Sequence, residues 1–311
     1  MSNQRFIDDL NRSLITKKDY EFHKNNPFIR PLFKMNENVK YIDVDVNYHP
    51  KGYTFKEMKE IILLAFLSID ERLYERILLM LENPKYKHNV FYKKSDRRYG
   101  DNSCGSSKIR VEVNITFDNT ARGLLTLAHE YIHAIGGRNV KRTKPREDCI
   151  GEIESLFIEK VLEDYFLKDG IISEDEYKLL HIERNNSFKN DLIFVLKNEK
   201  IMSLIQIPLT KEKLKELKDE LLQSEEGWNI FKGIYEYPKE EHTSSYRVRY
   251  IVGEIVASLL YEEYKLDKKH TMNKFIEFLD NNEKYSLDET TRLLVDKNPF
   301  EVLENIINKT K

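Results

Sequence analysis

The chain has 311 residues, of which 33% are charged and 40% hydrophobic, a composition typical of a soluble globular protein. Its 51 basic and 53 acidic residues leave a net charge of −2, so no overall positive field favours nucleic acid or an anionic membrane surface. We therefore expect neither nucleic acid nor a membrane as a partner. The sequence does not determine the oligomeric state.

The cysteines and the apolar stretches indicate a cytoplasmic protein. Cys104 and Cys149 are too few for a disulfide framework in a chain of this length. The N-terminal stretch MSNQRFIDDLNRS lacks the apolar run and the cleavage pattern of a signal peptide. The longest apolar stretch, Tyr250–Tyr261, is too short to cross a bilayer and carries Glu254.

The first elements in chain order are a short strand and a long helix. Tyr41–Val46 alternates apolar and acidic residues, which predicts the strand. Thr54 and Glu57 have the spacing of a capping box. The helical pattern that they open continues to about Asn83, and Pro84 ends it.

The strongest strand signal lies at Lys108–Phe117, after a basic and then Gly/Ser-rich loop over residues 92–108. Apolar residues alternate with polar ones along it, as in a strand with one buried face. An N-cap within Asp118–Thr120 then opens a helix, and Gly136-Gly137 closes it.

The rest of the chain is predicted to be mainly helical. A helix covers about Asp148–Lys168 and stops at Gly170, and Ser173 and Glu176 form another capping box. The predicted fold is mainly α with a small β-sheet.

The helix before Gly136 carries the pattern His129-Glu130-x-x-His133. Residues four apart on a helix are separated by about 40° around the axis and about 6 Å along it, so both imidazoles can reach one tetrahedral zinc ion. Glu130 is placed to act as general base on a water molecule. With 8 His in 311 residues, about 0.02 such patterns are expected by chance.

The alternative is a buried histidine pair that bonds to backbone carbonyls. The strand and caps around the motif favour the metal site. Its third ligand is expected on the next helix, where Glu152, Glu154 and Glu159 are candidates. Glu154 falls on the apolar side, where an unpaired carboxylate is costly, so periodicity alone mildly favours it. Glu163 is predicted to lie on a solvated face.

The stretch Lys108–Gly137 resembles the strand, cap and helix of the oligoendopeptidase F and thimet oligopeptidase family of zinc peptidases. This family places its third ligand in Glu-x-x-Ser-x-x-x-Glu, which here runs from Glu152 through Ser155 to Glu159. The resemblance implies that Glu152 binds the metal, that Glu159 orients a ligating histidine and that Ser155 lies beside them. Glu154 is kept as the reserve ligand.

A later segment resembles the family's His-then-Tyr segment, whose side chains bind the substrate carbonyl and the developing oxyanion. His242, Tyr246 and Tyr250 occupy the comparable places. The alternative is that the two tyrosines, four apart on a helix, are ordinary packing residues. The chain also departs from the family in having Ile132 where a Gly is usual, and in its length, about half the usual one.

The resemblance implies a gluzincin-like metallopeptidase fold, with a mostly helical region over residues 1–95 and a catalytic region over 96–311. We expect a zinc metalloendopeptidase that binds one Zn²⁺ and cleaves oligopeptides. The predicted strand Ile109–Phe117 would hold an extended substrate along an open edge. Two alternatives remain: a dedicated protease of one protein partner, such as an effector, toxin or regulatory factor, and a non-catalytic, metal-bound peptide-binding protein.

Overall fold

A computed structural model describes ten stretches of the chain. In residues 90–94, 103–106, 111–117, 197–204, 244–246 and 288 it describes the backbone alone. The strand predicted at Tyr41–Val46 and the candidate residue His242 lie outside the described residues. The ten stretches are residues 51–82, 90–94, 103–106, 111–117, 119–136, 150–204, 210–212, 215–216, 244–281 and 285–296.

The chain divides into two compact units, each assembled from separate segments. One consists of Ile42–Asn185 and Gly253–Asn298 and is called the first unit below. The second unit consists of Met1–Tyr41, Asn186–Val252 and Pro299–Lys311. The predicted boundary at residue 95, between a helical region and a catalytic region, stays a prediction. None of the helices in the described stretches is long and apolar enough to cross a membrane.

The first unit begins with two helices, α4 (Phe55–Ile69) and α5 (Glu71–Glu82). The predicted capping box is confirmed, because the Thr54 hydroxyl accepts from the Glu57 amide and the Glu57 carboxylate accepts from the Thr54 amide. The prediction of one continuous helix is wrong, because Asp70 adopts an extended backbone conformation between the two.

The break at Asp70 has a local cause. The Asp70 carboxylate accepts a hydrogen bond from the Arg72 amide at 3.0 Å and pairs with the guanidinium of the same residue. Aspartate competes with helical backbone bonding in this way and favours helix starts. The apolar periodicity continues across the break, which is why the sequence read as one helix.

Three strands form one sheet: β1 (Val90–Lys94), β2 (Ser103–Ser106) and β3 (Val111–Phe117). Their order is β1-β3-β2, with β1 parallel and β2 antiparallel to β3. Val113 of β3 is paired with both neighbours. The expectation that this strand offers an open edge to a substrate is therefore wrong at Val113 and Asn114, where both edges of β3 are paired.

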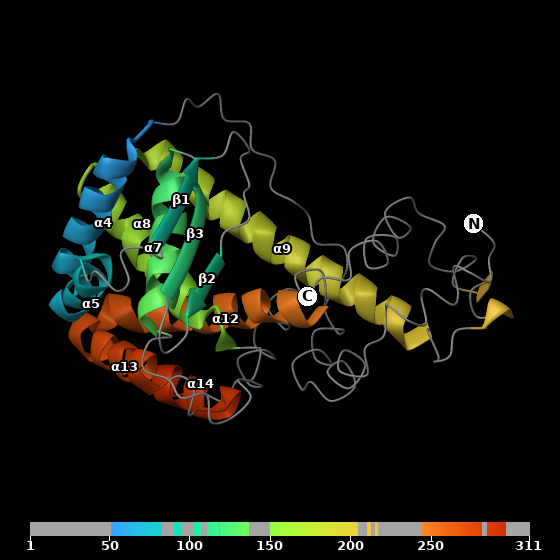
Figure 1. Ribbon diagram of the computed structural model, residues 1–311. Helices are drawn as coiled ribbons and strands as arrows, with labels where there is room; N and C mark the ends of the chain where they lie inside the picture. The colour runs from blue at the N-terminus through green and yellow to red at the C-terminus, as the bar shows by residue number, and fades with distance from the viewer. Residues whose placement is uncertain are drawn as a thin grey trace. The chain divides into compact units, whose positions relative to one another are not determined.

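Two adjacent helices, α7 (Ala121–Gly136) and α8 (Ile153–Lys168), form the centre of the first unit. Helix α7 also contacts β2 and β3, so it lies between the sheet and α8 (Figure 1). The side chains of Tyr131 on α7 and Phe157 on α8 are fully buried. This packing explains why α7 is mostly apolar. Its polar side chains are those of Arg122, Thr126, His129, Glu130, Tyr131 and His133.

Helix α8 begins later than predicted and ends where predicted. Residues 150–152 form a turn, and Glu152 is the N-cap residue, without a side-chain capping bond. At the other end Gly170 has φ 66°, and the Ile171 amide donates to the Phe166 carbonyl at 2.9 Å. A left-handed glycine with such a bond is a common helix stop.

The remaining helices are α9 (Glu174–Leu204), α12 (Ser244–Leu266), α13 (Lys268–Asn281) and α14 (Leu287–Val295). The predicted capping box of Ser173 at the start of α9 is confirmed. Helices α13 and α14 contact each other, and α13 also contacts α7. The prediction of a mainly helical protein is confirmed for the described residues.

Candidate metal centre

Helix α7 presents His129 and His133 one turn apart, on the side that faces α8. Their Nε2 atoms are 3.0 Å apart, and the rings meet edge to face with centroids 4.6 Å apart. The two side chains retain 13% and 18% of their exposure. The site is therefore largely buried yet still in contact with the surface.

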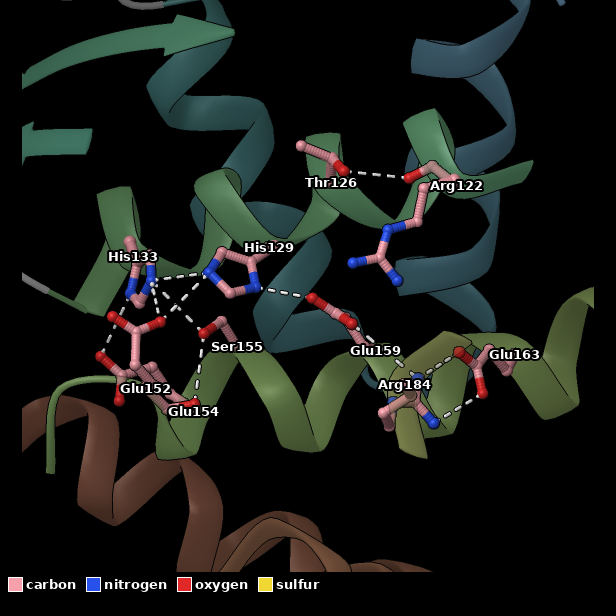
Figure 2. A network of polar contacts seen from close by, with 10 residues as sticks. All are labelled: Arg122, Thr126, His129, His133, Glu152, Glu154, Ser155, Glu159, Glu163 and Arg184. Atoms are coloured by element: carbon pink, nitrogen blue, oxygen red, sulfur yellow. Dashed lines mark hydrogen bonds and ion pairs between the residues drawn. The ribbon is translucent and has the colours of Figure 1, made fainter. Parts of the chain in front are cut away.

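Glu152, at the start of α8, completes a group of three. Its Oε2 atom lies 3.3 Å from Nε2 of His129 and 3.3 Å from Nε2 of His133 (Figure 2). The ligating atoms of these three residues all lie within 4.8 Å of one another. Two imidazoles and one carboxylate form a donor set that zinc accepts, with a fourth position left for water or substrate.

The opposite nitrogen of each ring faces a second carboxylate. His129 Nδ1 is 2.6 Å from Glu159 Oε1, and His133 Nδ1 is 3.5 Å from Glu154 Oε1. Contacts of this kind fix the orientation of a ring and leave Nε2 available for a ligand. Glu154, the reserve ligand of the sequence analysis, thus contacts Nδ1 of His133, whereas Glu152 contacts Nε2 of the same ring (Figure 2).

Ser155 lies beside the group, where the sequence places it. Its Oγ is 3.3 Å from Nε2 of His133 and also 3.3 Å from the backbone oxygen of Glu152, to which it donates. This hydroxyl connects α7 to the first turn of α8, next to Glu152.

The buried carboxylates control the protonation of both rings. Burial by itself would lower the pKa of His129, but hydrogen bonds to Glu152 and Glu159 hold it well above its ordinary value. Burial is likewise outweighed at His133, where the charge of Glu152 raises the pKa to about 9.

The imidazoles in return lower the pKa values of Glu152 and Glu159. Burial opposes the charged form of Glu152, but His133 and His129 outweigh it and hold its pKa well below the usual range. At Glu159 the hydrogen bond from His129 overcomes burial and lowers the pKa to about 2. The centre therefore holds ionised acids that attract positive charge.

Glu130 of α7 is buried and lies close enough to His129, His133 and Glu152 to interact with their charges. It is 6% exposed, and its Oε2 atom has no hydrogen-bond partner in the described part of the chain. Burial is the main cause that raises its pKa. A buried carboxylate oxygen without a partner is costly. The arrangement therefore fits a carboxylate that forms its missing hydrogen bond with a bound ligand.

The charge of the centre is consistent with a bound cation. Glu130, Glu152, Glu154 and Glu159 are all buried around two imidazoles. Within the described stretches Glu152 forms ion pairs with imidazoles only. Buried carboxylates are usually paired with cations or bound to metals, so these residues fit a divalent ion of the zinc type.

Of the three predicted oxyanion donors, two belong to the second unit and one lies outside the described residues. Tyr246 and Tyr250 belong to α12, in the segment assigned to the second unit. Their part in the site stays a prediction, as does that of His242. Ile132, the departure from the resembled family named in the sequence analysis, is fully buried.

The prediction of a solvated face at Glu163 is wrong. Glu163 is 1% exposed, and both of its oxygens accept from Arg184 of α9. Sequence reasoning missed Arg184 altogether. The available signal was the pair of acids at positions 159 and 163, which share one side of a helix that the structure buries from Ile153 to Glu163.

No protein-family model matches the sequence, and no curated protein is significantly similar to it. Solved structures nevertheless share its fold, and those with substantial structural overlap are peptidases or candidate peptidases. The fold resemblance to the oligoendopeptidase F type, predicted from the sequence, is confirmed.

Three of these structures define the resemblance. A candidate oligoendopeptidase F from Bacillus anthracis superposes with TM-score 0.60 at 14% identity, over 98% of this chain and 54% of that one. A candidate peptidase from Chlamydophila abortus gives 0.55 at 18%, over 97% and 56%. PZ peptidase A with an inhibitor gives 0.57 at 13%, over 99% and 57%. The chain thus spans about half the length of the structures that it matches.

Proposed function

We propose that the protein is a zinc-dependent metalloendopeptidase that cleaves oligopeptides. The observation that carries this proposal is the convergence of His129, His133 and Glu152, whose ligating atoms lie within 4.8 Å of one another. The peptidase fold supports it. The proposal takes the donor set as evidence for a metal and the fold as evidence for the reaction class.

In this proposal His129, His133 and Glu152 hold one zinc ion. Geometry favours Glu152 over Glu154 as the third ligand, because Glu152 faces both Nε2 atoms whereas Glu154 faces Nδ1 of His133. A zinc ion at this position would polarise the carbonyl of a peptide bond and acidify a water molecule.

Glu130 is the proposed general base. It takes a proton from the attacking water as the oxygen bonds to the carbonyl carbon, and it returns that proton to the amide nitrogen as the carbon–nitrogen bond breaks. The burial of its carboxylate and its missing hydrogen bond support this role. Glu159 and Glu154 hold the two imidazoles from behind during the reaction.

His242, Tyr246 and Tyr250 are proposed donors to the developing oxyanion, by resemblance to the family. A preorganised donor of this kind contributes about 3 kcal/mol to the transition state. Replacing Tyr246 or Tyr250 with Phe removes the hydroxyl and keeps the ring, so it separates a donor from a packing residue. A fall in kcat without a fall in thermal stability would support the donor role.

Metal analysis combined with mass spectrometry of peptide-library digests tests the proposal. We expect wild-type protein to bind one zinc ion and to cut many peptides of about five to fifteen residues. Glu130→Gln should keep the metal and lose about 10²- to 10⁴-fold in turnover. The matched control, Glu60→Gln on α4, changes an exposed acid and should cleave like wild type.

Each result has a distinct meaning. Wild-type protein without stoichiometric metal would overturn the proposal, and full activity in Glu130→Gln would overturn the mechanism. Cleavage of few or no library members by the metal-loaded protein would favour a dedicated protease of one protein. Peptide binding without any cleavage would favour a non-catalytic, metal-bound protein.

A further inference from the structure

The polar network of the metal centre continues past Glu159 to a third helix. Arg184 of α9 is 7% exposed. Its Nη1 donates to Glu163 Oε2 at 2.8 Å, and its Nη2 donates to the other oxygen of the same carboxylate. The same Nη2 lies 3.8 Å from Glu159 Oε2 (Figure 2). Arg184 is therefore shared between two buried acids of α8.

Glu159 is held from two sides. One of its oxygens bonds to His129 Nδ1 at 2.6 Å, and the other faces the guanidinium of Arg184. A carboxylate gripped at one oxygen can still rotate about its side-chain bonds, whereas contacts at both oxygens fix its plane. The position of the His129 ring then depends on a residue that does not touch it.

We propose that Arg184 is a positioning residue of the metal centre, acting through Glu159 on the ring of His129. Glu163 in turn holds Arg184 with two parallel bonds. The inference rests on the zinc site proposed above. It assigns to this protein a continuous series of polar contacts across three helices, α7, α8 and α9.

The guanidinium suits this place better than an ammonium group. Arginine offers several donors in a planar fork, so it can bind Glu163 with two bonds and still direct one nitrogen toward Glu159. A lysine at this position would keep the charge but could not grip Glu163 bidentately and face Glu159 at once. The distinction supplies a conservative variant for the test.

The test measures zinc affinity of the full chain by competition with a chromophoric chelator. Arg184→Met should weaken zinc binding about tenfold, at the lower end of the 10- to 100-fold range for residues that support metal ligands. Arg184→Lys should show a smaller but measurable loss. The control Arg76→Met breaks a separate ion pair, between Arg76 and Asp280, and should leave zinc affinity unchanged.

A double-mutant cycle separates positioning from a general loss of stability. If Arg184 acts through Glu159, then Arg184→Met should cause no further loss of zinc affinity in a Glu159→Gln background. Thermal unfolding in EDTA measures the stability of each variant without metal. A purely structural role would lower that stability and leave the affinity of the folded protein unchanged.

The outcomes separate this inference from the proposed function. Wild-type protein that binds no zinc would overturn both. Wild-type protein that binds zinc, with Arg184→Met and Arg184→Lys equal to it, would overturn the inference alone. A loss from Arg184→Met that persists in the Glu159→Gln background would also overturn it, because the effect would not pass through Glu159. If Arg184→Met does not fold, Arg184→Lys decides by the same comparison.

Discussion

Two buried polar clusters lie along α8 and differ in how their charge is balanced. The metal cluster consists of His129, His133 and Glu152. The salt-bridge cluster lies further along the helix and pairs each acid with a cation of the chain: Glu163 with Arg184, and Glu254 with Lys160 at 2.5 Å. In the metal cluster the described partners of Glu152 are imidazoles alone.

The difference is consistent with the proposal that the metal cluster receives a ligand. Where fixed ammonium and guanidinium groups balance the acids, the chain itself satisfies the cost of burial. Where only imidazoles face a buried carboxylate, a bound cation can take that place. Glu159 lies between the clusters, with one oxygen on His129 and the other toward Arg184.

The sharpest test of the comparison removes the carboxylate of the metal cluster. Glu152→Ala should reduce zinc affinity by more than 100-fold, beyond the roughly 10- to 100-fold range of supporting residues, and abolish peptide cleavage. Glu154→Ala is the matched control two residues away, and its loss should stay within that range. Equilibrium dialysis with zinc measures both. A larger loss of zinc affinity from Glu154→Ala than from Glu152→Ala would show that Glu154 is the third metal ligand and Glu152 a supporting residue.

Metal removal should act on one cluster and leave the other in place. Free zinc at about a thousand times its Kd stabilises the folded state by about 4 kcal/mol, so EDTA should lower the melting temperature of wild type. His133→Ala should show no such difference, since it lacks a ligand. Calorimetry with and without EDTA measures the effect. An equal EDTA response in His133→Ala would place the bound metal elsewhere.

The salt-bridge cluster should govern stability without governing metal binding. Lys160→Met leaves Glu254 without its ammonium partner. The pair is part-buried, so its loss should cost about 1 to 3 kcal/mol, between the values for exposed and fully buried pairs. Urea unfolding in EDTA measures the loss. The double variant Lys160→Met/Glu254→Leu removes both charges and should recover most of the lost stability. A loss of zinc affinity in Lys160→Met as large as in Glu152→Ala would show that the clusters are one energetic unit.

The smallest expected effect concerns Gly253 of α12, which packs against the backbone of the metal cluster. A Cβ atom at Gly253 would lie 2.9 Å from Cβ of Glu152 and 2.9 Å from Cδ1 of Leu156. Gly253→Ala should therefore displace Glu152, weaken zinc binding by up to about tenfold and cost about 1 kcal/mol of stability. Both are measured by chelator competition and urea unfolding.

A matched control for Gly253 lies one turn further along the same helix. Ala257 is fully buried, and Ala257→Gly should lower stability by about 1 kcal/mol through helix propensity and lost packing. It should leave zinc affinity unchanged. Unchanged zinc affinity in Gly253→Ala as well would show that Glu152 tolerates the displacement.

Local features of the structure could be predicted because they depend on nearby residues. The capping boxes of Thr54 and Ser173 depend on side chains three residues away and are confirmed. The spacing of His129 and His133 places both rings on one face of a helix, where their Nε2 atoms lie 3.0 Å apart. The break at Asp70 was missed, because the apolar periodicity continues across it and hides a single competing carboxylate.

Contacts between distant segments could not be predicted in the same way. Periodicity favoured Glu154 as the third ligand, but a helix buried from Ile153 to Glu163 has no solvated side from which to judge polar residues. The position of β3 between two other strands was equally hidden, because alternation identifies a strand but not its neighbours. Arg184 lies 21 residues from Glu163, beyond the reach of any local pattern.

The sequence by itself determined the helix that carries His129, Glu130 and His133, because an i, i+4 spacing has one geometric meaning on a helix. Only the tertiary structure decided which carboxylate faces both Nε2 atoms, which acids are balanced by cations, and that Gly253 touches Glu152. These choices depend on how α7, α8, α9 and α12 pack. Packing joins side chains that are distant in the chain, and their charges then balance each other or leave room for an ion.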